Sequence, residues 1–245
     1  MFRIIAACTL GLAAVTALPA SPAMADKSWR SSLDDAEPIP TSWTATGRFA
    51  QLTLAGSDEV IVSRGDRWQI RASGSPAVIA DLRFEVEDGD LLIGRRWRRT
   101  PVAGMARIEV IAPDVEAVTL AGSGMLRVDT MNGEEVDVTV AGSGTLDIGR
   151  VDATRLSATI AGSGDLEVAG RADRGRITIA GSGGIDGRQL QVDGASVSIA
   201  GSGDARFRAK GRVSASIVGS GHALVTGTTD CTQSRMGSGH LTCTR

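Results

Sequence analysis

The sequence predicts an all-β protein whose larger part is a β-solenoid, a stack of coils with about 18–20 residues in each coil. A Gly-Ser-Gly motif recurs at serine-to-serine steps of 20, 20, 19, 20, 18 and 18 residues. Runs of alternating apolar and polar residues flank each motif, as expected for strands with one buried face, whereas helical spacing is almost absent. The repeated serines are Ser123, Ser143, Ser163, Ser182, Ser202, Ser220 and Ser238.

The N-terminus has the pattern of a secretory signal peptide over residues 1–25. Arg3 precedes an apolar run at 4–18, and Ala23-Met24-Ala25 fits a cleavage site before Asp26. The alternative is a transmembrane anchor, but the 15-residue run is shorter than the roughly 20 residues that a spanning helix needs. We therefore expect an exported protein, periplasmic, outer-surface or secreted, whose mature chain has no membrane span.

Three further segments follow the predicted signal peptide. Residues 26–46 are polar and contain two prolines without a sustained period, so we interpret them as a linker. Residues 47–245 form the predicted β-helix domain. Within it, residues 47–112 are expected to supply N-terminal strands and residues 113–245 the repeat coils.

Aligning the repeats on their glycines places like side chains in columns. The apolar columns before and after the turn are expected to fill a narrow core between the two sides of each coil. One of these columns consists of Leu120, Val140, Ile160, Ile179, Ile199 and Ile217. A column of hydroxyls alternates with the apolar residues and should face outward, where stacked hydroxyls can hydrogen-bond. Its members are Thr119, Thr139, Thr159, Thr178, Ser198, Ser216 and Ser234.

A structural role explains the Gly-Ser-Gly motif better than a catalytic one. Glycine permits a positive φ at a sharp corner and lets neighbouring corners approach at strand spacing, about 4.8 Å. A serine hydrolase elbow instead requires Gly-x-Ser-x-Gly and a base. Here the spacing differs, the motif occurs seven times, and the chain contains only two histidines.

The two cysteines downstream of the predicted signal peptide, Cys231 and Cys243, lie 12 residues apart near the C-terminus. Exported proteins fold in an oxidising environment, so this pair suggests a disulfide. Two free thiols are the alternative.

Three stretches resemble the GIN-domain family, described as putative auto-transporter adhesin head domains. They are GRFAQLTLAGSDEVIVSRGDRWQIRASG, LRFEVEDGDLLIG and ARIEVIAPDVEAVTLAGSG, and the Gly-Ser-Gly coils follow them, so that the resemblance covers about residues 46–245. It implies a right-handed, single-stranded parallel β-helix and a role in surface adhesion, and it supplies no catalytic residues. The chain departs from the family pattern by inserting RRWRRTPVAGM and by ending in a cysteine pair.

The inserted stretch begins with the sharpest charged feature, Arg95, Arg96, Trp97, Arg98 and Arg99. Guanidinium groups pair with phosphate or carboxylate and an indole can stack, so these residues are a possible site for an anionic polymer such as lipopolysaccharide or an acidic glycan. The alternative is a solvated loop between the N-terminal strands and the solenoid. A net charge of −2 is too small to imply a nucleic-acid or membrane partner by bulk attraction, and no nucleic-acid partner is expected.

Asp204, His222 and His240 fall in one column, directly after successive corners. If the coils stack in register, the three side chains follow one another at about 5 Å, and two imidazoles with a carboxylate suit a transition metal. The alternative is ordinary variable surface, because the same column holds unrelated residues in earlier coils. We predict no cofactor and leave this metal site open.

Asp147, Glu167 and Asp186 form a second polar column, flanked by Arg127 and Arg206. Clustered carboxylates occur in polysaccharide-active β-helix enzymes, but sugar grooves usually carry aromatic rings and the repeat region has almost none. The favoured interpretation is therefore a non-enzymatic binding or adhesion module of the envelope or cell surface, whose partner is an unidentified surface polymer or protein. Binding of an anionic polymer through residues 95–99 is the second interpretation, and a polysaccharide-active enzyme is the third.

Overall fold

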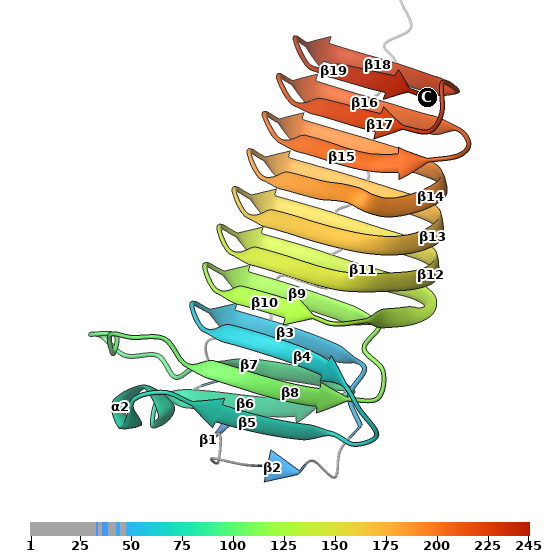
Figure 1. Cartoon of the computed structure of the whole chain (residues 1–245). Coiled ribbons are helices and arrows are strands. Elements are labelled where there is room, and N and C mark those ends of the chain that lie inside the picture. Colours follow the sequence, from blue (N-terminus) through green and yellow to red (C-terminus); the bar gives the residue numbers. More distant parts are fainter. Residues whose placement is uncertain (1–32, 34–35, 39–42, 45–47) are drawn as a thin grey trace, which may run out of the picture.

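Figure 1 shows a computed structural model of the chain as a tall stack of β-coils. The structure describes residues 33, 36–38, 43–44 and 48–245, so the predicted signal peptide and most of the predicted linker lie outside the described residues. Within the described ranges, no helix has the length and apolar character needed to cross a membrane.

The described elements are strands, with one short helix. The N-terminal part holds β1 (Glu37–Pro38), β2 (Trp43–Thr44), β3 (Gln51–Gly56), β4 (Glu59–Arg64), β5 (Gln69–Ser73), α2 (Pro76–Ile79), β6 (Leu82–Glu87), β7 (Asp90–Arg95) and β8 (Arg107–Ala112). The repeat region holds β9 (Ala117–Gly122), β10 (Met125–Val128), β11 (Met131–Gly142), β12 (Thr145–Gly162), β13 (Asp165–Gly181), β14 (Gly184–Gly201), β15 (Asp204–Ala209), β16 (Val213–Gly219), β17 (His222–Thr226), β18 (Cys231–Gly237) and β19 (His240–Thr244).

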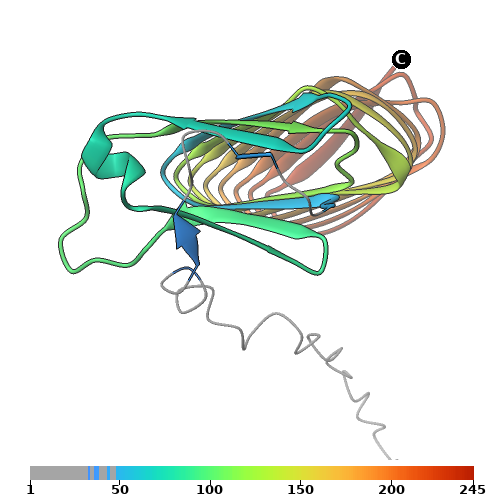
Figure 2. The same ribbon diagram turned by 90° about the horizontal axis from the view of Figure 1, so that it is seen from below.

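The predicted β-solenoid is confirmed. From β9 onward every strand pairs in parallel with the equivalent strand of a neighbouring coil, and β12, β13 and β14 each run from one Gly-Ser-Gly corner almost to the next. Seen along the stack, the coils overlay as a flattened loop with two long sides (Figure 2). Each long side is a layer of parallel strands, and the core lies between the two layers.

The N-terminal strands do not follow the chain order along the stack. The coil made by β3 and β4 lies between the β7–β8 coil on one side and the β9–β10 coil on the other, all in parallel. β5 and β6 then pair antiparallel with β8 and β7 and cover the open end of the solenoid. This antiparallel layer, at the bottom of Figure 1, ends the parallel stack at its N-terminal side.

The β3–β4 coil is an additional copy of the repeat that the Gly-Ser-Gly search did not find. Gly56 pairs in register with Gly122, and Met125 pairs with Glu59, so Asp58 occupies the position of the second glycine of the motif. The signal was present in the sequence, since LTLAGSDEVIV aligns residue by residue with VTLAGSGMLRV. The regular coils therefore begin at β3 and not at β9.

The corners depend on glycine for a steric reason. Gly142 has φ +133°, and a Cβ at that position would lie 2.3 Å from the carbonyl oxygen of Gly122 in the neighbouring coil. That same oxygen accepts the N–H groups of Ser143 and Gly144 at 2.9 and 3.0 Å. Backbone hydrogen bonds between successive corners thus occupy the space where a side chain would stand.

The columns predicted from the repeat form the core. Aliphatic side chains of successive coils are in register on both long sides, and almost all of them are buried. Burial of such a side chain contributes about 1.5–3 kcal/mol. The hydroxyl column faces outward as predicted and extends one coil further, because Thr53 pairs with Thr119.

Candidate functional site

The loop Arg95–Ala106, which joins β7 to β8, replaces the Gly-Ser-Gly corner of its coil. Gly94 pairs with Ala55 before the corner and Arg107 pairs with Glu59 after it, so this corner is much longer than its counterpart at Gly56–Asp58. The loop extends beyond the corners of the neighbouring coils on the same side of the stack (Figure 1). The insertion noted in the sequence is therefore an enlarged corner.

The buried carboxylate of Asp58 holds this loop at its base. Arg95 donates from Nε to Asp58 Oδ2 at 2.8 Å, and its Nη2 pairs with Asp58 Oδ1. The same carboxylate accepts the N–H of Ala106 at 2.7 Å. The guanidinium also donates to the carbonyl oxygens of Val102 and Gly104 at 2.9 and 2.7 Å. The hydrogen bond to Asp58 raises the pKa of Arg95 above its ordinary value.

A second buried carboxylate, Asp81, neutralises further charge in the loop. Arg96 and Arg98 both pair with it, with Nε distances of 3.3 and 2.7 Å to Asp81 Oδ1. Arg99 is exposed and makes no ion pair within the part of the chain that the structure describes. Four arginines against two carboxylates leave the cluster with a net charge of about +2.

The structure thus brings Arg95, Arg96, Arg98 and Arg99 onto one loop but engages three of them internally. Trp97 lies between them and is 61% exposed. Sequence reasoning missed Asp58 and Asp81, because Asp58 lies 37 positions from Arg95, and Asp81 lies 15 and 17 positions from Arg96 and Arg98. Binding of an anion by this loop remains a prediction.

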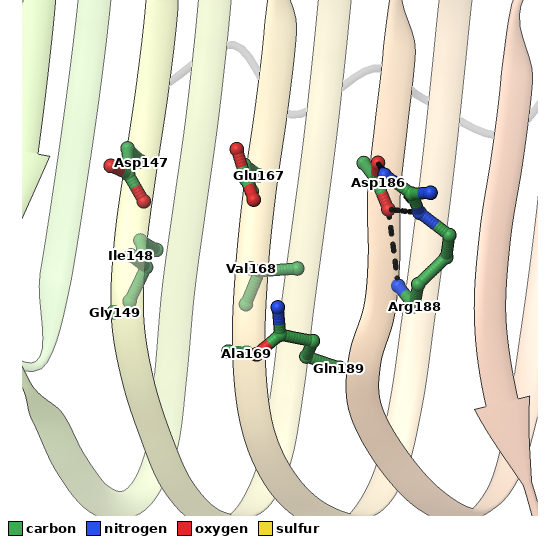
Figure 3. Close-up of a pocket in the computed structure, with 9 residues that line it drawn as sticks. All are labelled: Asp147, Ile148, Gly149, Glu167, Val168, Ala169, Asp186, Arg188 and Gln189. Atoms are coloured by element: carbon green, nitrogen blue, oxygen red, sulfur yellow. Dashed lines mark hydrogen bonds and ion pairs between the residues drawn. The ribbon is translucent and has the colours of Figure 1, made fainter.

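The acidic column predicted from the repeat lines a shallow groove (Figure 3). It lies on the long side that follows each corner, whereas the hydroxyl column lies on the long side that precedes it. Asp147, Glu167 and Asp186 are in register on adjacent coils, and Arg127 and Arg206 follow at the two ends. Arg127 pairs with Asp147 at 3.0 Å, and these side chains are half-exposed.

Asp186 is the most strongly paired member of the groove. Arg188 donates from Nε and from Nη2 to its two oxygens at 2.9 and 2.6 Å, and this pairing lowers the pKa of Asp186. A general acid in glycoside hydrolysis needs the opposite, a carboxyl group whose pKa is raised so that it stays protonated. Glu167 makes no ion pair within the described part of the chain. The groove is therefore better described as a charged surface than as an acid–base pair.

The predicted stacking of Asp204, His222 and His240 is confirmed by the register of the last three coils. His222 Nδ1 lies 3.6 Å from Asp204 Oδ1, and the same carboxylate oxygen accepts a hydrogen bond from the backbone N–H of His222 at 3.2 Å. Over the residues that the structure describes, however, no group of three His, Cys, Asp or Glu side chains is arranged to hold a metal ion. The column is exposed and does not converge on one point.

Cys231 and Cys243 form a disulfide in the last coil. The two cysteines continue the columns of Val213 and Val225, so the bridge crosses from one long side of the solenoid to the other at its C-terminal end. Gln233, in the column of Ala215, accepts the N–H of Leu241 at 2.9 Å through Oε1. The final coil thus joins its two strands by a covalent and a polar contact.

Comparison with solved structures gives the same architecture. A structure described as a putative adhesin from Bacteroides fragilis NCTC 9343 matches with a TM-score of 0.74 and 18% identity, over 85% of this chain and 99% of that chain. A putative adhesin from Parabacteroides merdae ATCC 43184 matches with a TM-score of 0.67 and 18% identity, over 83% and 94% of the two chains. A structure described as a putative lipid binding protein from Parabacteroides distasonis ATCC 8503 matches with a TM-score of 0.64 and 23% identity, over 86% and 98%. At these identities the likeness establishes the fold.

A search of curated proteins finds no significant match. The family described as "Putative auto-transporter adhesin, head GIN domain" matches residues 48–229, a range that includes the enlarged corner and ends before β18 and β19 of the last coil. The resemblance inferred from the sequence is thereby confirmed, and the chain belongs to the GIN-domain family of putative auto-transporter adhesin heads.

Proposed function

We propose that the protein is an exported, non-enzymatic binding and adhesion module of a bacterial envelope or cell surface. The observation that carries this proposal is a face of the solenoid that offers the same groups coil after coil. A surface that repeats at the strand spacing can contact an extended partner at many weak points, whose combined affinity exceeds that of any single contact. The family's description as an adhesin head supports the same interpretation.

The repeated groups are the outward hydroxyl column and a column of small side chains beside it. The hydroxyls pair in register from Thr53 to Ser234. Apart from a 3.4 Å hydrogen bond from Thr53 to Asp90, these hydroxyls make no hydrogen bond within the described part of the chain. They are therefore free to exchange water for the polar groups of a ligand. The small side chains two positions later are Ala121, Ala141, Ala161, Ala180 and Ala200.

The experiment compares adhesion of the exported protein with that of a variant whose central hydroxyls are removed. Thr139→Val, Thr159→Val and Thr178→Val together keep the shape and strand preference of the side chains. The control carries Ser143→Ala, Ser163→Ala and Ser182→Ala, which remove as many hydroxyls from the corners of the same coils. We expect the threonine variant to lose adhesion to cells or envelope polymers and the serine variant to retain it. Equal adhesion by both, or turnover of any polysaccharide by the parent protein, would contradict the proposal.

Export is tested separately, by cell fractionation and by N-terminal sequencing of the fractionated protein. A mature chain that starts at Asp26 in the periplasm, on the outer surface or in the medium supports the proposal. A full-length chain retained in the cytoplasm is the opposite result.

An anionic polymer bound through Arg95–Arg99 is the second candidate. It is supported by the net charge of about +2 and by Arg99, which has no ionic partner among the described residues. Binding to heparin or to an acidic glycan should weaken as salt rises, because exposed charges are screened. Arg99→Ser should weaken it without changing stability. Binding that is unaffected by both salt and Arg99→Ser would remove this candidate.

A further inference from the structure

The Arg95–Ala106 loop gathers two exposed apolar side chains next to its arginines. Trp97 is 61% exposed and Met105 is 63% exposed. Six large hydrophobic side chains are exposed in the described part of the chain, and Trp97 is the only aromatic one among them. The other two tryptophans in that part of the sequence are Trp43 and Trp68, and Trp68 is half-buried and donates to the Phe49 carbonyl oxygen at 3.1 Å.

Internal contacts hold this loop in one conformation. Arg95 ties its base to Asp58 and to two of the loop's own carbonyl groups. Gly104 lies beside α2, since a Cβ there would be in ordinary van der Waals contact, 3.4 Å, with a methyl group of Val78. Helix α2 is itself fixed at its N-terminus, where Ser75 accepts the N–H of Val78 and Pro76 begins the helix. A loop held in this way has little conformational entropy to lose on binding.

The loop stands apart from the two long sides of the solenoid. Together with α2 it projects from one end of the flattened cross-section, beyond the outline of the coils (Figure 2). It also lies near the N-terminal end of the stack, far from the disulfide-linked coil (Figure 1). A broad flat partner can therefore reach the loop without meeting either long side of the solenoid.

We propose that this loop is a membrane-contact element, in which Trp97 and Met105 enter the interfacial layer of an anionic lipid bilayer. Arg99 and the exposed parts of Arg96 and Arg98 face the headgroups. An indole favours the boundary between headgroups and hydrocarbon, where its ring is buried and its N–H stays hydrated. Arginine near the surface is attracted to anionic lipid. A soluble polyanion would use the charges of the loop but would leave Met105 in water, so the exposed apolar pair favours the lipid surface.

This inference deepens the second candidate function, because it names an anionic lipid surface as the partner of the same loop. It does not depend on adhesion through the hydroxyl face. The two can therefore fail separately, and the experiment includes a soluble polyanion so that the outcomes are distinguishable.

The experiment measures binding of the exported protein to vesicles by flotation. One set contains phosphatidylcholine alone and the other equal parts of phosphatidylcholine and phosphatidylglycerol. The test variant carries Trp97→Ser and Met105→Ser. The matched control is Met236→Ser, which removes a 73% exposed methionine at the far end of the solenoid. All variants are first checked for unchanged thermal unfolding.

We expect the parent and the Met236→Ser control to float with the anionic vesicles. The double variant should bind at least about tenfold more weakly, since it can no longer bury these two apolar side chains in the bilayer. Tryptophan emission of the parent should shift to the blue on vesicle binding, and Trp97→Phe should abolish that shift.

Three results overturn the membrane proposal. The first is a parent protein that does not bind anionic vesicles, with or without heparin binding. The second is a double variant that binds as well as the parent. The third is binding that survives the double substitution but is lost with Arg99→Ser and is competed by heparin. The third result leaves the anionic-polymer candidate standing, whereas absence of both vesicle and heparin binding removes both.

Discussion

Asp58 and Arg95, 37 positions apart in the sequence, form a two-point ion pair at the base of the enlarged corner. The Asp58 carboxylate is almost completely buried, while the guanidinium retains partial contact with solvent. Asp58 stands where regular corners have their second glycine. The first coil thus exchanges a glycine for a carboxylate, and this carboxylate binds both ends of the loop that enlarges the neighbouring corner.

Arg95→Ser should destabilise the protein by about 3–5 kcal/mol, because it leaves a buried carboxylate without its counter-charge. Arg99→Ser, in the same loop, should change the free energy of unfolding by less than about 0.5 kcal/mol. Denaturant unfolding of the two variants measures the difference. Equal effects would show that the Asp58–Arg95 pair does not hold the loop.

Gly142→Ala should cost a few kcal/mol, because even a Cβ would lie 2.3 Å from the Gly122 carbonyl oxygen and the residue would keep a positive φ. Ser143→Ala should cost no more than about 0.5 kcal/mol, since its hydroxyl is exposed and makes no hydrogen bond with any described residue. Thermal unfolding of the two single variants tests this contrast. A larger loss for Ser143→Ala than for Gly142→Ala would contradict the steric explanation of the corner.

The repeated part of the fold was predictable because every coil presents the same physical problem. Each needs inward aliphatic side chains at fixed positions and a corner without a Cβ, so the columns from Val118 to Ile217 follow from the period alone. The placement of the β7–β8 coil below the β3–β4 coil was not predictable in this way. It depends on pairing between strands with dissimilar sequences, such as Leu92 opposite Thr53, and on an antiparallel layer outside the repeat.

The arginine loop was only partly predictable. The sequence identifies four arginines around Trp97, but their charge state as a group depends on Asp58 and Asp81, which reach them through the stacking of different coils. Similarly, the sequence places Asp204, His222 and His240 in one column, but column order does not say whether the side chains converge. A repeat specifies the register of the backbone more directly than the directions of exposed side chains.

Asp90 should make the protein less stable as pH rises from about 4. Burial raises the pKa of this carboxyl, against a smaller opposing effect of the Thr53 hydrogen bond, and its Oδ1 is buried without a hydrogen-bond partner. An acid whose pKa is higher in the folded protein binds more protons there than in the unfolded chain. Its ionisation therefore lowers the free energy of unfolding between the unfolded and folded pKa values.

Asp90→Asn should accordingly raise the free energy of unfolding at pH 7 and flatten its pH dependence above pH 4. Asp88→Asn is the matched control, because Asp88 is exposed in the adjacent turn and asparagine tolerates its positive φ of 51°. Unfolding curves collected from pH 4 to pH 8 provide the measurement. A pH profile that Asp90→Asn leaves unchanged would show that Asp90 is not the responsible group.

The disulfide should matter most for the last coil. Arg235 and Gln233 occupy positions where the preceding coil has Ile217 and Ala215, so this coil has lost aliphatic contacts that stabilise the others. Among the described residues, β18 and β19 pair with β16 and β17 of the preceding coil and with no strand on their other side. Cys231 and Cys243 compensate by closing a short loop, a constraint that contributes roughly 3 kcal/mol in the chain-entropy account.

Replacing both cysteines by serine should therefore increase hydrogen exchange from 219 to 245 and leave exchange in the coils of β11 to β13 unchanged. The effect is local because each coil of a solenoid contacts only its neighbours. A variant with Gln233→Ala alone should show a weaker increase in the same region, since it removes one hydrogen bond, to the Leu241 N–H, and keeps the covalent link. Exchange that rises equally in all coils, or that does not rise at all after the double substitution, would show that the disulfide does not cap the solenoid. Free thiols in unreduced peptides of the protein isolated from an oxidising compartment would lead to the same conclusion.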